Sequence, residues 1–393
     1  MPDKEQIIEV ESLPLEIISG AAYLIKQANP NSYTHGMFKY PCKFIPEIPR
    51  WGVNTFLPDK KGTIFDPFSG SGTTLLEANV YGMDAYGTEI DDIAKLIIKV
   101  KTTVLNSQKV EVLEQEYFKI MEIMQQDMTE QFRPKIANLE HWFSENAIAE
   151  LGRMKMYIDN ICDADVRDFF KLCMVSIIKR VSNADDTSPK PYVSNKVKKV
   201  PPAVTREFTS VFRRYKQMMT ELSGIEKMGN TRLIEGDALT FQMPVGIDLA
   251  ITSPPYINAF DYGRTMRLEN LWMATLTEEE LREKKSRYVG TEKINAKVEK
   301  SSLAILERSG LLKNYFYQIM EQDEKRALIV KKFFEDMEEN LRAVYCQMNP
   351  GGKYVIVIGN STIRKVVVES WRVIEELANR LGFRTIQYFS YII

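Results

Sequence analysis

A glycine-rich turn between an apolar strand and a helix constrains the fold more than any other feature. The segment GTIFDPFSGSGTTLLEANVYG, residues 62–82, predicts a strand, a turn and a helix in that order. A second strand over 84–90 and a second helix over 91–106 follow, with Asp91 or Asp92 as the N-cap. This β-α-β-α order is typical of the open parallel sheet of an α/β protein.

A long helical region interrupts this order before it resumes. Residues 107–228 carry helical patterns around a loop at 182–204 that is rich in Pro, Ser and Lys. Further elements are expected in the rest of the chain: strands at 231–239, 247–256 and 353–359, helices at about 325–347 and 365–381, and a last strand at 384–393.

We therefore predict an α/β, Rossmann-like sheet that carries a large helical insertion. The first half of the sheet domain, with the N-terminal segment, spans 1–106, the insertion spans 107–228, and the second half spans 229–393. The insertion is a candidate region for recognising a target.

Composition excludes several other classes of protein. Two histidines and four cysteines without a CxxC pair make a zinc site improbable, so no metal is expected. No run of about 18 apolar residues occurs, and the acidic start MPDKEQIIEVESLPLE lacks the features of a signal peptide. We expect a cytoplasmic protein without a membrane span. Its net charge of −1 means that any nucleic-acid surface must concentrate positive charge locally.

The glycine-rich turn DPFSGSGTT, residues 66–74, is a candidate ligand site. Gly70 and Gly72 permit a positive φ and a close approach of the backbone to a ligand. The lysine and the spacing of a phosphate loop are missing, and so is the dinucleotide pattern GxGxxG. Asp66 at the strand end would repel pyrophosphate but suits a cationic or zwitterionic ligand such as S-adenosylmethionine.

Two further acidic residues follow the next expected strands. Glu89 lies 23 positions after Asp66, about where a carboxylate binds a ribose diol in doubly wound folds. Asp237 is expected to end the third strand, where it could accept a hydrogen bond from an adenine amino group. Ligands bind at the carboxyl ends of strands in such sheets, so three acidic residues in strand order favour one shared site over three separate caps.

The fourth strand delivers the sequence TSPPY, residues 252–256, to the same edge. Pro254 and Pro255 remove N–H donors and fix φ, which leaves carbonyl groups and the Ser253 hydroxyl as a rigid set of acceptors. Such acceptors can grip the hydrogens of an exocyclic amino group and turn its lone pair toward a methyl donor. Tyr256 offers an aromatic face to a base that has left its stack.

Together, these motifs resemble those of the S-adenosylmethionine-dependent amino-group DNA methyltransferases of restriction–modification systems. The resemblance covers about 30–106 and 229–393 and implies a class I methyltransferase sheet. Members with serine before PPY, as here, are typically N4-cytosine enzymes, and those with aspartate are mostly N6-adenine enzymes. The segment HGMFKYPCKFIPEIPRWGVNTF, residues 35–56, resembles the part that precedes the cofactor motif and closes over methionine.

The resemblance implies a set of site residues. The catalytic set is Ser253, Pro254, Pro255 and Tyr256. The cofactor set is Lys43, Phe44, Asp66, Phe68, Gly70, Gly72, Thr73, Glu89, Asp237 and Thr252. One departure is that the insertion precedes Asp237, whereas target-recognition regions usually lie between the adenine-binding acid and the catalytic motif or outside both halves.

The sequence thus favours methyl transfer from S-adenosylmethionine to cytosine N4 in duplex DNA. An N6-adenine DNA enzyme, an RNA amino-group methyltransferase and a non-catalytic DNA-binding subunit remain alternatives. The expected partner is double-stranded DNA, and a cognate restriction endonuclease is a candidate. The recognition sequence and the oligomeric state do not follow from the sequence.

Other residues are weaker candidates. The basic segments 179–200 and 282–300 are candidates for contact with a phosphate backbone or are simply solvated. Asp261, Tyr262 and Arg264 are candidates for the base pocket or its lid, and Gly359, Asn360 and Ser361 for support of the catalytic turn. Cys42, His35 and His141 are expected to have packing or capping roles.

Overall fold

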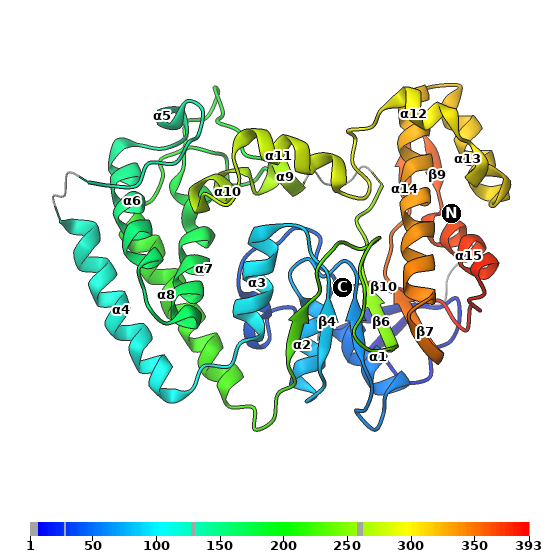
Figure 1. The fold of residues 1–393 in the computed structure, drawn as a ribbon, viewed down its shortest axis with the longest axis horizontal. Coiled ribbons are helices and arrows are strands. Elements are labelled where there is room, and N and C mark those ends of the chain that lie inside the picture. Colours follow the sequence, from blue (N-terminus) through cyan, green and yellow to red (C-terminus); the bar gives the residue numbers. More distant parts are fainter. Residues whose placement is uncertain (1–6, 27–28, 127–129, 258–261, 393) are drawn as a thin grey trace.

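A five-stranded parallel sheet forms the centre of the protein (Figure 1). The computed structural model describes all residues except 1–6, 27–28, 127–129, 258–261 and 393. The sheet has the order β5-β4-β3-β6-β7. Its strands are β3 (Ile64–Asp66), β4 (Ala85–Gly87), β5 (Thr231–Leu233), β6 (Ile247–Thr252) and β7 (Met348–Ile356).

The strand order reverses between β3 and β6. The chain moves outward from β3 through β4 to β5 and then returns to β6 on the other side of β3. Ligands of open α/β sheets bind at the carboxyl ends of the strands beside such a reversal. Register pairs Ile64 with Leu249 and Phe65 with Ala250, and all four side chains are fully buried. Near-continuous apolar strands of this kind fit a parallel sheet covered on both faces.

Helices α1 (Glu47–Phe56), α2 (Thr73–Val80) and α3 (Asp92–Thr102) accompany the first strands. The Asp91 carboxylate accepts hydrogen bonds from the backbone N–H groups of Ile93 and Ala94, which confirms the expected N-cap of α3. The predicted β-α-β-α order of residues 62–106 is therefore correct.

The helical insertion is also confirmed as helical. It contains α4 (Ser107–Gln125), α5 (Leu139–Trp142), α6 (Glu145–Asp159), α7 (Ala164–Val181) and α8 (Val204–Ser223), with the expected loop between α7 and α8. Its core includes stacked rings, for example Phe170 and Phe212, whose planes are 7° apart. Three helices that follow the catalytic motif lie beside it: α9 (Tyr262–Thr265), α10 (Arg267–Met273) and α11 (Glu278–Lys284). Trp272 of α10 packs edge-on against Phe143, so this lobe draws on both halves of the chain.

A second lobe lies on the other side of the sheet (Figure 1). Its elements are α12 (Ala296–Ser301), α13 (Gly310–Met320), α14 (Glu324–Tyr345), β8 (Ser361–Ile363), β9 (Val366–Val368) and α15 (Ser370–Leu381). Helix α14 was expected, whereas α13 and the β8–β9 hairpin were not. The last helix begins at Ser370 and not near 365, because residues 361–368 pair as that hairpin.

The chain termini form a separate small sheet. Strands β1 (Ile7–Val10) and β10 (Ser390–Ile392) both pair in parallel with β2 (Ala22–Ile25). The expected strand at 384–393 is thus only three residues long, and its partner is β2. In the described part of the chain, no helix combines the length and the apolar character needed to cross a membrane.

Candidate active site

A pocket opens at the carboxyl ends of β3, β4 and β6. It has about 790 Å³ of empty space, which includes its opening to solvent, and lies within the usual range of ligand sites. It is lined by several of the predicted residues: Lys43, Phe44, Phe68, Gly70, Thr73, Glu89, Asp237, Ser253 and Pro255. Segments more than 180 positions apart in the sequence therefore meet around one cavity.

The glycine-rich turn adopts the conformation that glycine permits. Gly70 and Gly72 have φ of +50° and +75°, the left-handed region that side chains disfavour. The Gly70 N–H donates to Glu89 Oε2 over 2.8 Å, so the turn is tied to the end of the neighbouring strand. Gly87 of β4 is also required, because a Cβ there would lie 2.1 Å from Ser69 Oγ.

Glu89 lies at the floor of the pocket. Its Oε1 accepts the backbone N–H groups of Ile90 and Asp91, each over 2.8 Å. Burial raises the pKa of its carboxyl to about 7, although the backbone N–H donors from Asp91, Gly70 and Ile90 counter this rise. The carboxyl therefore changes charge near neutral pH.

Asp66, at the end of β3, is fully buried and does not line the pocket. Its Oδ1 accepts the Phe68 N–H over 3.1 Å and the Thr252 hydroxyl over 2.6 Å. Burial raises its pKa to about 6, while these hydrogen bonds act in the opposite direction. Its Oδ2 is buried without a hydrogen-bond partner in the described part of the chain, which leaves one acceptor for a donor.

The prediction that Asp237 ends a strand is wrong. Strand β5 ends at Leu233, and Asp237 lies in the turn beyond it. Its Oδ1 caps that turn by accepting the N–H groups of Leu239 and Thr240 and the Thr240 hydroxyl. Its Oδ2 lies 3.7 Å from the guanidinium of Arg287, and both side chains line the pocket.

The proline turn places Ser253 and Pro255 at the pocket, whereas Tyr256 is not among the residues that line it. A Cβ at Gly359 would lie 3.5 Å from the Tyr256 ring, so the strand end after β7 adjoins this turn. Burial raises the pKa of Tyr256, and a hydrogen bond with Ser253 lowers it.

Five predicted residues do not line the pocket: Asp66, Gly72, Thr252, Pro254 and Tyr256. The reason differs among them. Asp66 and Thr252 are fully buried and bind each other, so Thr252 holds Asp66. Gly72 faces Ile98 instead, because a Cβ added to Gly72 would lie 3.0 Å from Cγ1 of Ile98.

The segment before the cofactor motif reaches the pocket through Tyr40, Pro41, Cys42, Lys43 and Phe44. Lys43 Nζ donates to the carbonyls of Pro30 and His35, so its ammonium is already engaged within this segment. Cys42 is exposed with φ of +56°, which corrects the expectation that it is a packed residue.

The two histidines differ in burial, since His35 is buried and His141 is exposed. His35 is buried with Nε2 3.0 Å from Glu77 Oε1, and burial lowers its pKa to about 4. His141 lies in the last turn of α5 and packs edge-on against Trp142.

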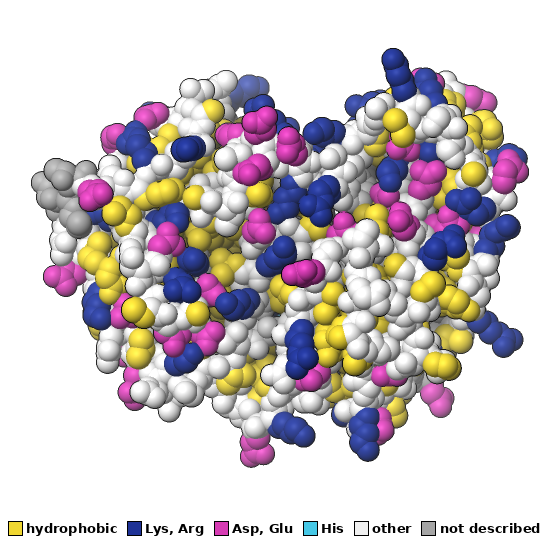
Figure 2. Space-filling model, viewed as in Figure 1, with side chains coloured by type: hydrophobic (Ala, Val, Ile, Leu, Met, Phe, Trp, Pro, Cys, Tyr) yellow, Lys and Arg dark blue, Asp and Glu magenta, His cyan; other side chains and the backbone are white. Residues whose placement is uncertain are grey.

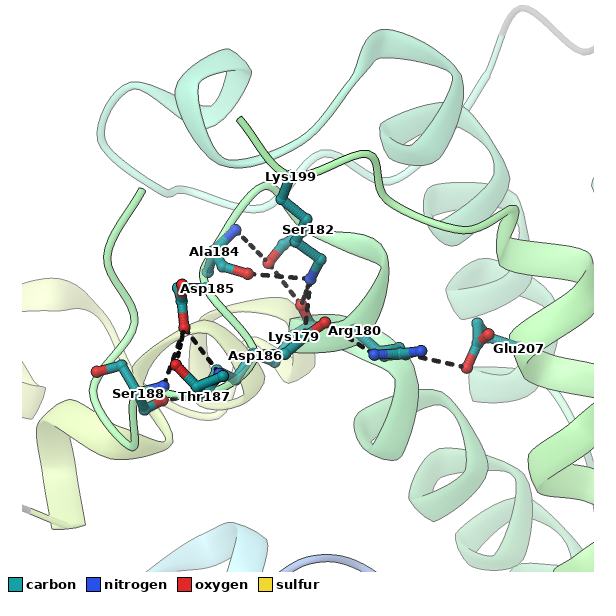
Figure 3. A network of polar contacts seen from close by, with 10 residues as sticks. All are labelled: Lys179, Arg180, Ser182, Ala184, Asp185, Asp186, Thr187, Ser188, Lys199 and Glu207. Atoms are coloured by element: carbon teal, nitrogen blue, oxygen red, sulfur yellow. Dashed lines mark hydrogen bonds and ion pairs between the residues drawn. The ribbon is translucent and has the colours of Figure 1, made fainter. Parts of the chain in front are cut away.

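Three cationic side chains of the basic segment 179–200 bind partners at the end of α7 and in the loop that follows it (Figure 3). Lys199 Nζ donates to the carbonyls of Lys179 and Ala184 and to Asp186 Oδ1, over 3.2, 2.9 and 2.8 Å. Arg180 pairs with Asp186 over 2.8 Å, and Lys179 donates to the Ser188 carbonyl. These three cations therefore have partners within the protein, and contact of segment 179–200 with a phosphate backbone stays a prediction. Asp261 lies outside the described residues.

Several pocket residues were not found from the sequence. Ile90 adjoins Glu89, and Leu239 adjoins Asp237, so proximity to a motif could have indicated both. Arg287, Tyr288 and Val289 come from the basic segment 282–300, where nothing local indicates a pocket.

The geometry defines a protein with a ligand pocket shared by a glycine turn and a proline turn. Residues 18–100 match a family model described as DNA methylase, N6_N4_Mtase. The type II methyltransferase M.MvaI of Kocuria varians is 26% identical over 413 residues, which cover 98% of this chain and 90% of that protein.

Two further relatives are similar over less of the chain. M.BsoBI of Geobacillus stearothermophilus is 26% identical over 75% of this chain and 61% of its own length. M.MjaII of Methanocaldococcus jannaschii is 31% identical over 22% of this chain and 16% of its own length. No solved structure shows significant similarity. These similarities support a DNA amino-methyltransferase of the restriction–modification type.

Proposed function

We propose that this protein uses S-adenosylmethionine to methylate N4 of cytosine in duplex DNA, at a specific site. One observation carries the proposal: Ser253 of the proline turn lines the same pocket as Gly70 and Glu89 of the cofactor turn. A methyl donor and an amino group bound to these two turns would therefore meet in one cavity.

The residues present fit this cofactor. The carboxyl groups of Glu89 and Asp237 line the pocket and favour a cationic ligand with donor groups. Glu89 in its charged form can accept the hydroxyls of a ribose, and Ile90 and Leu239 give apolar walls suited to a purine. When bound, S-adenosylmethionine supplies an electrophilic methyl group on a sulfonium.

The proline turn would prepare the nucleophile. An exocyclic amine is a poor nucleophile because its lone pair is delocalised into the ring. The Ser253 hydroxyl and the carbonyls of the turn accept its hydrogens and direct the lone pair toward the pocket. The prolines offer no competing N–H, and their fixed φ keeps this geometry.

Tyr256 would hold the flipped base by stacking, which contributes roughly 1–3 kcal/mol. After methyl transfer the nitrogen carries a positive charge and loses a proton to water. No general base with a raised pKa is required for this last step. Serine at position 253 supports cytosine over adenine through the family resemblance.

Duplex DNA is accordingly the proposed substrate, the cytoplasm the proposed location and a cognate restriction endonuclease the proposed functional partner. A notch is visible between the α9–α11 side and the α12 side (Figure 2), and we propose that DNA approaches this edge of the sheet through it. The residue ranges 1–106, 107–228 and 229–393 remain our proposed division into domains.

Nucleoside mass spectrometry tests the proposal. Unmethylated genomic DNA and total RNA are each incubated with the protein and methyl-labelled cofactor, and then digested. We expect label in N4-methylcytosine from DNA. Label only in N6-methyladenine would overturn the cytosine assignment, and label only in RNA would identify an RNA enzyme. No label in either polymer would favour a non-catalytic DNA-binding subunit.

A further inference from the structure

The segment Lys284–Gly290, here called the strap, crosses the carboxyl edge of the sheet. It connects α11 in the helical lobe to the segment that leads to α12 in the other lobe (Figure 1). Three of its residues, Arg287, Tyr288 and Val289, line the pocket. None of them belongs to the glycine turn, the proline turn or the segment that precedes them.

The strap is attached to the strand end that carries Glu89. The Tyr288 hydroxyl donates to Asp91 Oδ2 over 3.1 Å, while Asp91 Oδ1 caps α3. Lys284 Nζ donates to Asp92 Oδ2 over 3.0 Å. Because the Asp91 N–H also donates to Glu89 Oε1, Tyr288 and Glu89 share one hydrogen-bonded unit.

The other contacts of the strap reach Asp237 and the proline turn. The Arg287 guanidinium lies 3.7 Å from Asp237 Oδ2. Gly290 has φ of +77°, and a Cβ there would lie 3.1 Å from the Tyr256 carbonyl oxygen. The strap thus contacts Asp237 directly, is linked to Glu89 through Asp91, and also adjoins the backbone of the proposed catalytic turn.

The Tyr288 ring adds an aromatic wall to the apolar part of the pocket. Ile90, Leu239 and Val289 supply the rest of that surface. A hydroxyl anchored on Asp91 fixes the orientation of the ring before a ligand arrives, which reduces the entropy lost on binding. An aromatic ring held beside apolar walls suits a flat heteroaromatic ligand such as adenine.

We propose that the strap roofs the nucleoside end of the cofactor and that Tyr288 is a cofactor-binding residue. This inference rests on the proposed function, because it assigns the nucleoside of S-adenosylmethionine to this end of the pocket. It also links the two turns, since Tyr288 and Gly290, which lies against the Tyr256 carbonyl, belong to the same strap.

The test measures binding of S-adenosylhomocysteine, the unreactive product, to the full chain without DNA. Isothermal titration calorimetry compares the wild type with Tyr288→Ala, Tyr288→Phe and the control Tyr317→Ala, a tyrosine that is 49% exposed on α13. We expect Kd to rise about 10-fold or more for Tyr288→Ala. A rise of about 3-fold is expected for Tyr288→Phe, and none for the control.

A second measurement uses only the wild type, so it does not depend on whether a variant folds. Hydrogen exchange of the wild type with and without S-adenosylhomocysteine should show slower exchange in residues 284–290 when the ligand is bound. Unchanged exchange there, or a Tyr288→Ala Kd within twofold of the wild type, would overturn the strap proposal. A wild type that does not bind S-adenosylhomocysteine would overturn the proposed function and the strap proposal with it.

Discussion

Strands β3 and β6 are neighbours in the sheet, and both end in a turn that contains proline, yet the two turns differ in hydrogen bonding. The turn after β3 uses glycines at positive φ and directs a backbone N–H to a carboxylate. The turn after β6 has two prolines and therefore offers carbonyls and a hydroxyl in place of N–H groups. The same sheet edge thus offers donors beside one strand and acceptors beside the next.

The two turns are also joined physically. The Thr252 hydroxyl donates to Asp66 Oδ1, and the Thr74 hydroxyl donates to the Ile251 carbonyl over 3.1 Å. Each bond crosses between the β3 turn and β6. A mutation can therefore affect ligand binding and nucleophile positioning separately only at a residue that takes no part in these two hydrogen bonds.

Tyr256→Ala should separate the two turns most strongly. Loss of the stacking ring should lower the rate of methyl transfer to DNA by about 100-fold, while Kd for S-adenosylhomocysteine changes by less than about 3-fold. The rate is measured with labelled cofactor and the Kd by calorimetry. Tyr317→Ala serves as the control and should leave both unchanged. A matched loss of cofactor affinity in Tyr256→Ala would mean that the turns act as one site.

Gly70→Ala should have the opposite profile. A left-handed φ of +50° disfavours alanine by roughly 1–2 kcal/mol, and its Cβ would lie 3.3 Å from the Tyr40 ring. We expect Kd for S-adenosylhomocysteine to rise about tenfold. In the control Gly310→Ala, nothing in the described part of the chain lies within 4 Å of the added Cβ, so binding should be unchanged. Equal affinities of the two variants would argue against the glycine turn as the ligand cradle.

Thr252→Val tests the link between the turns. The substitution keeps the shape but removes the hydroxyl from Asp66, a buried hydrogen bond to a carboxyl that contributes about 1–3 kcal/mol. The free energy of unfolding, measured in urea, should fall by about that amount, and the pKa of Asp66 should rise further. The exposed Thr220→Val on α8 is the control. Equal free energies of unfolding for Thr252→Val and Thr220→Val would show that the hydrogen bond between Thr252 and Asp66 does not stabilise the fold.

The pH dependence gives the smallest effect. Because the pKa of Glu89 is about 7 and its charged form accepts the ribose hydroxyls, affinity for S-adenosylhomocysteine should rise about threefold from pH 6.5 to 7.5. Stability of the free protein has the opposite sign: a carboxyl whose pKa is raised by burial stabilises the fold when protonated, and this contribution is lost as pH rises through about 7. The pH dependence of affinity and that of stability should both be weaker in Glu89→Gln. If this variant retains both in full, another group causes them.

How far the sequence predicts the structure depends on the range of the interactions. Local signals were sufficient for the glycine turn, for the Asp91 cap and for the run of helices in the insertion. They failed for Asp237, because the strand before it ends at Leu233, four residues before Asp237. The pairing of β10 with β2 joins segments over 360 positions apart, and no periodicity reports such a contact.

The site shows the same division. Residues beside a motif, such as Ser253 and Glu89, line the pocket as the motif spacing suggested. Tyr288 could not be found in this way, since its position depends on a hydrogen bond to Asp91, almost 200 positions away. The roles of all these residues in methyl transfer remain predictions.

Ser253→Ala tests whether the hydroxyl on the proline turn binds the amine of a flipped cytosine. Nucleoside mass spectrometry would quantify N4-methylcytosine in unmethylated genomic DNA treated with the wild type or the variant, with calorimetry of S-adenosylhomocysteine on both. We expect N4-methylcytosine from the wild type, at least about 100-fold less from the variant, and cofactor affinities within about threefold of each other. Equal amounts of methylated cytosine from both proteins would contradict the account, and so would methylation of adenine alone by the wild type.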